Sequence, residues 1–464
     1  MGAVALGVAL SGGAPVAPAR ADTLESALMQ AYVNNPSLNA QRASVRVTDE
    51  NVPQALAGYR PRISVTATGG EQQIRTETKS VASNGATTYN TLSGYNAPFS
   101  AGITATQTLF NGFQTANRTR QAESQVLAAR AVLRNSEQSV MLDAATAYMN
   151  LLRDTAILDL QRRNVEVLQE QLRQTRDRFN VGEVTRTDVA QSESRLASGR
   201  SQVLTAESNY KTSAAFYRRV IGANPGKLAA GTPVDRFSPA TLPASISIGT
   251  ATNPSVISAE YNVDVAQHQV KVAEGALYPT LSVQGSFQKN LGAVGNLSTI
   301  ESYNASILGT LSVPIYQGGS EYALVRQAKE TLGQRRLDLD NARDTARQNV
   351  VQSWGQLEAA KANIDATEAQ VQASEIALNG VREEARVGQR TTLDVLNAQQ
   401  ELVNARVSLV TAQRDRVVAS YTLLASVGRL SPQVLGLRVP VYDARVHYEQ
   451  VRDSWVGLRT PDGR

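Results

Sequence analysis

Two kinds of hydrophobic periodicity alternate along this chain of 464 residues. Apolar and polar residues alternate over residues 63–68 and 99–106, and again over 281–287 and 303–315. Period-two alternation over about ten residues, with one apolar face, is typical of membrane β-strands. Taken alone, each strand fits an antiparallel hairpin of a soluble sheet equally well. The pattern therefore predicts two strand pairs, each with one apolar face.

Long helical segments follow the strand pairs. Residues 113–179 contain neither Pro nor Gly, and their apolar residues recur at three- and four-residue spacing. Residues 320–385 are also free of Pro. At 1.5 Å per residue, each segment would form a helix roughly 100 Å long. A compact domain needs no such length, so we expect coiled-coil packing, with a turn and a second helix after each segment.

The order of motifs is repeated along the chain. Asn35-Pro36 recurs as Asn253-Pro254, and Val181-Gly182 recurs as Val387-Gly388. Each half is predicted to run helix, strand, strand, long helix, turn and helix, and a Pro/Gly-rich connector joins the halves. The expected parts are an export signal over 1–21, structural repeats over 22–222 and 246–428, a connector over 223–245 and a tail over 429–464.

Export is predicted from the N-terminus. Residues 4–9 are apolar, and Ala19-Arg20-Ala21 has the form of a cleavage site for a secretory leader. No Lys or Arg precedes the apolar stretch, so we expect the true start to lie further upstream. A flexible tail rich in Ala, Gly and Pro is the alternative.

Composition narrows the possible functions. The absence of Cys excludes Cys-based metal and redox sites, and two distant histidines, His268 and His447, disfavour a His-based centre. Lys and Arg number 46 against 41 Asp and Glu, a mixed balance unlike that of a nucleic-acid interface. No nucleophile, metal-ligand or phosphate-loop constellation stands out. We therefore expect no enzyme activity, no cofactor and no nucleic-acid partner.

Four membrane strands cannot close a barrel by themselves. An open edge in lipid leaves backbone N–H and C=O groups unpaired, at a cost of several kcal/mol each. Closed barrels have about eight or more strands. Other subunits must therefore complete the sheet, most simply by cyclic symmetry. Two copies would supply eight strands and three would supply twelve, and composition leaves both open.

Together these features resemble the TolC-type outer-membrane efflux and secretion channels, the outer membrane factor family. The resemblance covers the chain from Asp22 to about Leu430. It implies a mixed fold, an all-α coiled coil plus a membrane β-barrel, in which a homotrimer forms a twelve-stranded barrel on a long periplasmic α-helical tunnel. The motifs that carry it are the two Asn-Pro pairs, Leu109-Phe110-Asn111-Gly112 before a long helix, the two Val-Gly turns, and the Thr-x-x-Asp-Val of Thr185 to Val189 and Thr391 to Val395.

The resemblance also implies function, location and partners. A member is the outer-membrane exit duct of a tripartite efflux pump or type I secretion system in a Gram-negative cell, and it conducts substrates passively to the exterior. Its partners are a periplasmic adaptor (membrane fusion protein), an inner-membrane pump of the RND or ABC type and outer-membrane lipid. A periplasmic coiled-coil adaptor or scaffold without a pore is the alternative, and it would not need lipid-facing strand pairs. Nothing in the sequence separates drug efflux from protein secretion.

The turns between the paired helices are candidate contact sites. By resemblance, an adaptor docks on Val181-Gly182-Glu183 and on Val387-Gly388-Gln389. The glycines have a second explanation, because a left-handed residue without a Cβ commonly ends a helix.

Asp394 is the candidate for a pore constriction. By resemblance its carboxylate faces the lumen, where threefold symmetry gathers three copies and favours cations. Many relatives carry a second acid three residues later, but this chain has Asn397, so the second ring is uncharged. Thr185-x-x-Asp188 and Thr391-x-x-Asp394 also match a capping box, which accounts for both acids through helix capping alone.

Arg390 is the candidate for a gate latch. By resemblance it ties the inner coil to its neighbour through Thr187 and Asp188, and breaking an Arg–carboxylate link would free a helix pair to swing outward. A solvated turn arginine is the alternative. The family's second latch uses a Tyr where this chain has Ala385, so that latch is absent or built differently.

Overall fold

The computed structural model describes residues 22–292, 300–461 and 463. The predicted export signal over 1–21 lies outside the described residues. The chain divides into two compact units. The tip unit, as we call it, comprises the described residues up to 39 together with 135–253 and 346–441; the strand unit comprises 40–134, 254–345 and the described residues from 442 onward.

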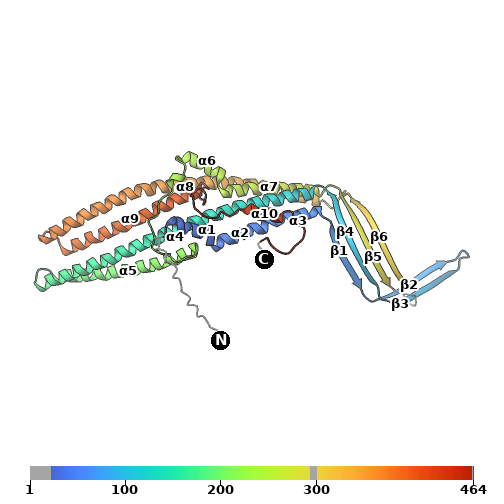
Figure 1. Cartoon of the computed structure of the whole chain (residues 1–464), viewed down its shortest axis with the longest axis horizontal. Coiled ribbons are helices and arrows are strands. Elements are labelled where there is room, and N and C mark those ends of the chain that lie inside the picture. Colours follow the sequence, from blue (N-terminus) through green and yellow to red (C-terminus); the bar gives the residue numbers. More distant parts are fainter. Residues whose placement is uncertain (1–21, 293–299, 462, 464) are drawn as a thin grey trace, which may run out of the picture. The chain divides into compact units, whose positions relative to one another are not determined.

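Two long helices contribute residues to each unit (Figure 1). They are α4 (Gln114–Asn180) and α8 (Ser320–Arg386), each of 67 residues. Their bounds agree within one or two residues with the segments that the sequence predicts to be helical. A short turn follows each helix, and the partner helices are α5 (Arg186–Ile221) and α9 (Thr392–Ser426).

A four-stranded antiparallel sheet lies in the strand unit (Figure 1). Its strands are β1 (Arg62–Gly69), β4 (Phe99–Asn111), β5 (Thr280–Gly292) and β6 (Ile300–Ser312), in the order β1-β4-β5-β6. The central pairing, β4 with β5, joins segments that are far apart in sequence. The sheet therefore combines the two predicted strand pairs into one surface.

A second sheet adds two strands to the four that the sequence predicts. They are β2 (Gln72–Val81) and β3 (Thr87–Asn96), which pair antiparallel with each other. The polar stretch at Ser83 to Gly85 forms the turn between them. Gly85 has φ 80°, and the Ala86 amide donates to Asn84 Oδ1 at 3.1 Å. Sequence reasoning missed these strands because neither shows an apolar face.

The core of the tip unit forms where the helices meet the connector. Helix α1 (Leu24–Asn34) and helix α6 (Leu242–Thr252) belong to this unit, with a single 3-10 turn at Asp235–Phe237. The hydroxyl of buried Tyr148 lies 2.7 Å from the carbonyl oxygens of both Asp22 and Ala229. Trp354 packs on a cluster of Val350, Leu357, Leu423 and Val427. Both aromatic residues, each in the middle of a long helix, pack against neighbouring helices.

The strand unit also contains helices ahead of each strand pair. The helical stretch ahead of β1 is divided into α2 (Pro36–Asp49), α3 (Asn51–Leu56) and a 3-10 turn at Ala57–Tyr59, and α2 begins in the tip unit. Pro53 lacks an N–H and favours this division. Helix α7 (Pro254–Gly275) precedes β5, and α10 (Ala444–Val451) lies in the C-terminal tail. In the described part of the chain, no helix is both long enough and apolar enough to cross a bilayer.

Candidate functional site

The four-stranded sheet has one apolar face. The register aligns Val65 with Ile103, Ile103 with Phe287, and Phe287 with Ala305, so one row of side chains crosses all four strands. These side chains lie on an uncovered face, and Val65 is 72% exposed. Uncovered apolar area of this extent is unfavourable in water and marks an interaction surface. Lipid is the medium in which such a face is stable.

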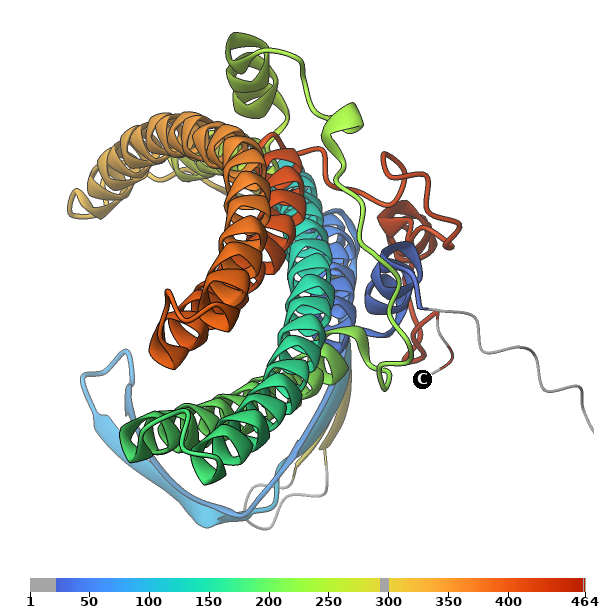
Figure 2. The same cartoon turned by 90° about the vertical axis from the view of Figure 1, so that its left-hand side faces the viewer.

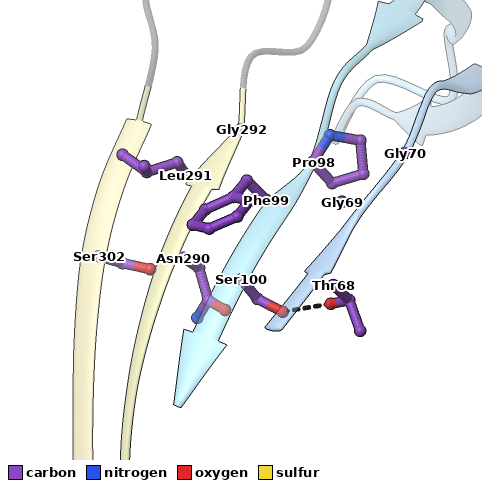
Figure 3. Close-up of a pocket in the computed structure, with 10 residues that line it drawn as sticks. All are labelled: Thr68, Gly69, Gly70, Pro98, Phe99, Ser100, Asn290, Leu291, Gly292 and Ser302. Carbon is purple, nitrogen blue, oxygen red and sulfur yellow. Dashed lines mark hydrogen bonds between the residues drawn. The ribbon is translucent and has the colours of Figure 1, made fainter. Parts of the chain in front are cut away.

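The opposite face of the sheet is polar. A row three residues further along β1 aligns Thr68 with Ser100, Ser100 with Asn290, and Asn290 with Ser302. Figure 3 shows these side chains at one end of the sheet, with the Thr68 and Ser100 hydroxyls hydrogen-bonded at 2.6 Å. The residues that line this shallow hollow include no titratable side chain. Its hydroxyls and amide suit contact with water or a passing solute rather than acid–base chemistry.

Charged and aromatic side chains occupy the far end of the apolar face. Lys289 on β5 and Glu301 on β6 form an ion pair, and the Tyr303 hydroxyl donates to Glu301 at 2.5 Å. The Lys289 ammonium lies 5.2 Å from the centroid of the Tyr303 ring. Such groups are found where membrane strands leave the hydrocarbon.

The two helix turns of the tip unit face the viewer in Figure 2. Gly182 and Gly388 have φ 82° and 83°, so both turns use the left-handed conformation that glycine favours. Val181 and Val387 beside them are each 72% exposed. An exposed valine at both turns gives the tip unit two small apolar contact points, which sequence reasoning assigned to an adaptor.

Each turn leads into a capping box. The Asp188 carboxylate accepts from the Thr185 amide at 2.9 Å, and the Thr185 hydroxyl accepts from the Asp188 amide at 3.3 Å. Asp394 and Thr391 repeat these bonds at 2.9 and 3.2 Å. The bond from the Thr391 amide is the first cause that holds the pKa of Asp394 below its ordinary value of 3.8. Asp394 is therefore ionised at neutral pH.

Asn397, one helical turn after Asp394, has a partner on another helix. The Arg195 guanidinium of α5 donates to its side-chain oxygen at 2.5 Å. The sequence predicted an uncharged second ring at Asn397, and Arg195 was missed. The signal available in the sequence was its position seven residues after Asp188, about two helical turns along the same face.

Arg390 is engaged within its own hairpin. Its Nε donates to Glu384 Oε2 at 2.8 Å, and this bond is the main cause that raises the pKa of the guanidinium. Among the described residues, no hydrogen bond or ion pair joins Arg390 to Thr187 or Asp188. Within a single chain the predicted latch is therefore not formed.

A cavity of about 790 Å³ lies between the two hairpins of the tip unit. The wall from the first hairpin carries Arg178 as well as acidic residues, and the wall from the second carries arginines. The lining includes Glu166, Glu170 and Asp188 on one side and Arg382, Arg386 and Arg390 on the other. Arg390 and Asp188 both line this cavity, from opposite hairpins.

Sequence comparison places this arrangement in a known family. The profile of the outer membrane efflux protein family matches residues 27–223 and 246–429. The outer membrane efflux protein BepC of Brucella suis is 41% identical over 462 residues, which cover 99% of this chain and 97% of that protein. The outer membrane protein TolC of Escherichia coli is 26% identical, over 93% of this chain and 87% of that protein.

Structure comparison agrees in fold. The CmeC outer membrane channel of Campylobacter jejuni matches with a TM-score of 0.74 at 18% identity, over 93% of this chain and 89% of that chain. At this identity the match shows the architecture alone. The agreement confirms the predicted combination of a long helical part with a strand part.

Proposed function

The chain belongs to the outer membrane efflux protein family, and from that membership we propose how it assembles and conducts. It is an outer-membrane exit duct for efflux or type I secretion in a Gram-negative cell, with a helical tunnel in the periplasm. The family consists of channels rather than enzymes. This membership excludes the alternative of a poreless periplasmic scaffold.

The proposed assembly is a homotrimer with a twelve-stranded barrel. The observation that carries it is the four-stranded sheet, apolar on one face and polar on the other, whose outer strands β1 and β6 each have one neighbour in the sheet. In lipid those edges require partners. Three copies joined edge to edge would place the apolar rows toward lipid and the rows of Ser, Thr and Asn toward a water-filled lumen.

The proposed division of the chain follows the order of its elements. A strand pair, a 67-residue helix and a shorter capped helix occur once within 22–222 and again within 246–428. We assign these segments as two structural repeats. The connector over 223–245 and the tail over 429–464 would form a domain around the tunnel, and helix α6 begins just inside the connector at Leu242.

The proposed partners are a periplasmic adaptor and an inner-membrane pump of the RND or ABC type. The adaptor would dock on the two turns that expose Val181 and Val387, with Gly182, Glu183, Gly388 and Gln389 beside them. An exposed valine at a glycine turn is a knob that a helical hairpin of complementary shape can accept. The pump would then deliver substrate to the tunnel through that adaptor.

The proposed constriction is a ring of Asp394, with Asn397 one turn deeper. The capping bonds use Oδ2 of Asp394 and leave its charge in place, so capping and a pore role are compatible. Three ionised carboxylates on one axis would favour cations. Arg390, held by Glu384 in the single chain, would pair with Thr187 and Asp188 of a neighbouring hairpin when the gate is closed.

Conductance and ion selectivity in planar bilayers test the proposal. We expect small, cation-selective currents from the purified protein. Asp394→Ala should reduce cation selectivity several-fold, because the charged ring is lost. Thr391→Ala is the matched control, since it weakens the same capping box and leaves the charge of Asp394 in place.

Two results would contradict the proposal. Unchanged selectivity in Asp394→Ala would remove this carboxylate from the lumen. A monomer in detergent, measured by light scattering with the detergent contribution subtracted, would remove the shared barrel.

A further inference from the structure

The last part of the tail, residues 442–461, belongs to the strand unit and runs beside the helices that lead into β1. His447 Nδ1 lies 3.0 Å from Oδ2 of Asp49, and the Asp49 side chain is fully buried. One residue further on, Tyr448 packs on the cluster that contains Val52, and the Arg130 guanidinium lies 5.1 Å from its ring centroid. The tail is thus anchored in the strand unit by a buried hydrogen bond and an aromatic contact.

Arg60 holds Ser454 and Trp455 of the tail at the base of the sheet. Its Nη1 donates to the Ser454 carbonyl oxygen at 2.6 Å, and its guanidinium lies 4.6 Å from the centroid of the Trp455 ring. Arg60 stands two residues before β1, which begins at Arg62. From Asp49 to Arg60 and from His447 to Trp455 the two segments run in the same direction, toward the strands. In Figure 1 the red tail passes beside the blue α3.

The tail ends its docked path with an uncovered apolar segment. Trp455 is 68% exposed, Val456 91% and Leu458 fully exposed. We call residues 455–458 the anchor segment. Arg60 contacts the Ser454 carbonyl and the Trp455 ring, yet most of the Trp455 surface stays uncovered, so these contacts bury little of the tryptophan. The arrangement instead presents Trp455 to something outside it.

The base of the sheet lies at the level of a membrane interface. Strand β4 has 13 residues. At about 3.4 Å per residue and a tilt of about 40° this gives a height of roughly 34 Å, against an apolar band of about 25 Å in barrels of this kind. The strand ends therefore reach the headgroup region. Exposed aromatic residues flank all four strand ends on this side: Tyr59, Phe113, Tyr278 and Tyr316.

We propose that the anchor segment inserts Trp455, Val456 and Leu458 into the periplasmic leaflet of the outer membrane, with Arg60 as the residue that positions it. This inference rests on the proposed barrel. The partner is the phospholipid headgroup and upper acyl region, where Trp is enriched. Arg60, Arg62 and Arg459 lie in or beside this segment and complement lipid phosphates.

Lipid fits these observations better than a protein partner does. Arg60, two residues before β1, ties the start of the anchor segment to the end of the sheet where the exposed aromatic residues lie. Tyr303 and Lys289 mark the opposite end of that same face. The tail would therefore add a tryptophan to the aromatic residues on the periplasmic side, where the strand ends carry only tyrosines and a phenylalanine.

Tryptophan fluorescence in vesicles tests the inference, because the chain has only Trp354 and Trp455. Trp354→Phe leaves Trp455 as the sole reporter. The full chain is reconstituted into vesicles of phosphatidylethanolamine and phosphatidylglycerol, and part of the lipid carries bromine at shallow acyl positions. We expect an emission decrease of about two-fold on bromination, as befits an indole at the interface. Trp455→Phe is the matched control: Trp354 lies in the tip unit, and its emission should not change.

Arg60→Gln tests whether the contacts of Arg60, rather than the amino-acid composition of the tail, place Trp455 in the lipid. The tail keeps its sequence but loses the hydrogen bond to Ser454 and the cation–π contact, so quenching of Trp455 should fall toward that of an aqueous tail. Co-flotation of the protein with the vesicles is measured in every sample. Failure to float would contradict the proposed membrane channel itself. Flotation with unquenched Trp455 would overturn the anchor alone and point to coverage by a second copy or another protein.

Discussion

The two hairpins of the tip unit form their turns with the same backbone geometry but differ in their charged contacts. Gly182 and Gly388 have φ values one degree apart, and the capping threonines of the following helices differ by only a few degrees in φ and ψ. The carboxylate-to-amide bond is 2.9 Å in both capping boxes. Short-range sequence therefore determines the turn, whichever hairpin it belongs to.

The difference lies in the charged contacts that each hairpin makes. In the first hairpin Arg178 pairs with Glu183 across the turn at 2.9 Å, whereas in the second Arg390 pairs with Glu384 at 2.8 Å. In the second hairpin Asn397 receives Arg195 from the first. The comparison teaches that two turns of the same geometry can contribute different residues to a proposed gate: Arg390 from the second hairpin, and Thr187 and Asp188 from the first. Four predictions test the shared turn geometry and the differing contacts of the hairpins separately.

The largest effect is expected from the core between the hairpins. Leu396 of α9 is 2% exposed and packs with Leu168, Leu172 and Leu196 of the first hairpin. Leu396→Ala should lower the free energy of local unfolding by about 2–5 kcal/mol, because it removes a buried side chain and leaves a cavity. Hydrogen exchange should accelerate in both hairpins.

Leu378→Ala is the control for this change. Leu378 is similarly buried but packs with Val395 and Leu402 inside the second hairpin. Its exchange effect should be confined to α8 and α9. Equal acceleration of α4 and α5 in both variants would show that Leu396 does not specifically link the hairpins.

The capping threonines should give equal, smaller effects. Thr185→Ala and Thr391→Ala each remove the hydroxyl that accepts from the third helical amide, which costs about 0.5–2 kcal/mol in local stability. Hydrogen exchange at the first turn of α5 and of α9 measures this loss. Thr→Ser at either position keeps the acceptor and should show little change. Unequal losses would contradict the equivalence of the two turns.

The pH dependence of the α9 cap follows from the lowered pKa of Asp394. Because the folded-state pKa lies below the unfolded value of 3.8, the cap contributes fully above that pH and is lost as pH falls through the folded value. We expect the first turn of α9 to fray only in strong acid. Exchange rates corrected for intrinsic pH dependence provide the measurement, and Asp394→Asn should remove the transition. A transition above the unfolded pKa would contradict the sign.

The smallest effect is expected at Asn397. Asn397→Asp places a carboxylate beside Arg195, whose charge offsets it, so cation selectivity should rise by about two-fold or less. Adding Arg195→Gln removes the offset and should raise selectivity further. Reversal potentials under a salt gradient measure both. If the double variant matches the single one, Arg195 does not influence the pore.

Part of the candidate site could be predicted from sequence because it depends on neighbouring residues. Thr-x-x-Asp spacing is sufficient for a capping box, and Val-Gly followed by that box is sufficient for the turn. The partners of Arg390 and Asn397 could not be predicted in the same way. Arg390 finds Glu384 six residues away across a turn, and Asn397 finds Arg195 on another helix. These choices depend on which helix faces lie together.

The sequence by itself determined the long helices, the glycine turns and the alternation of the four main strands, because each rests on steric and hydrogen-bonding preferences within a few residues. Only the tertiary structure decided that β4 pairs with β5, that β2 and β3 form a separate hairpin, and that the tail brings Trp455 to Arg60. Many strands could pair through their backbones, and many arginines could make a cation–π contact. Which of them meet is selected by the packing of segments distant in sequence, a choice that periodicity does not encode.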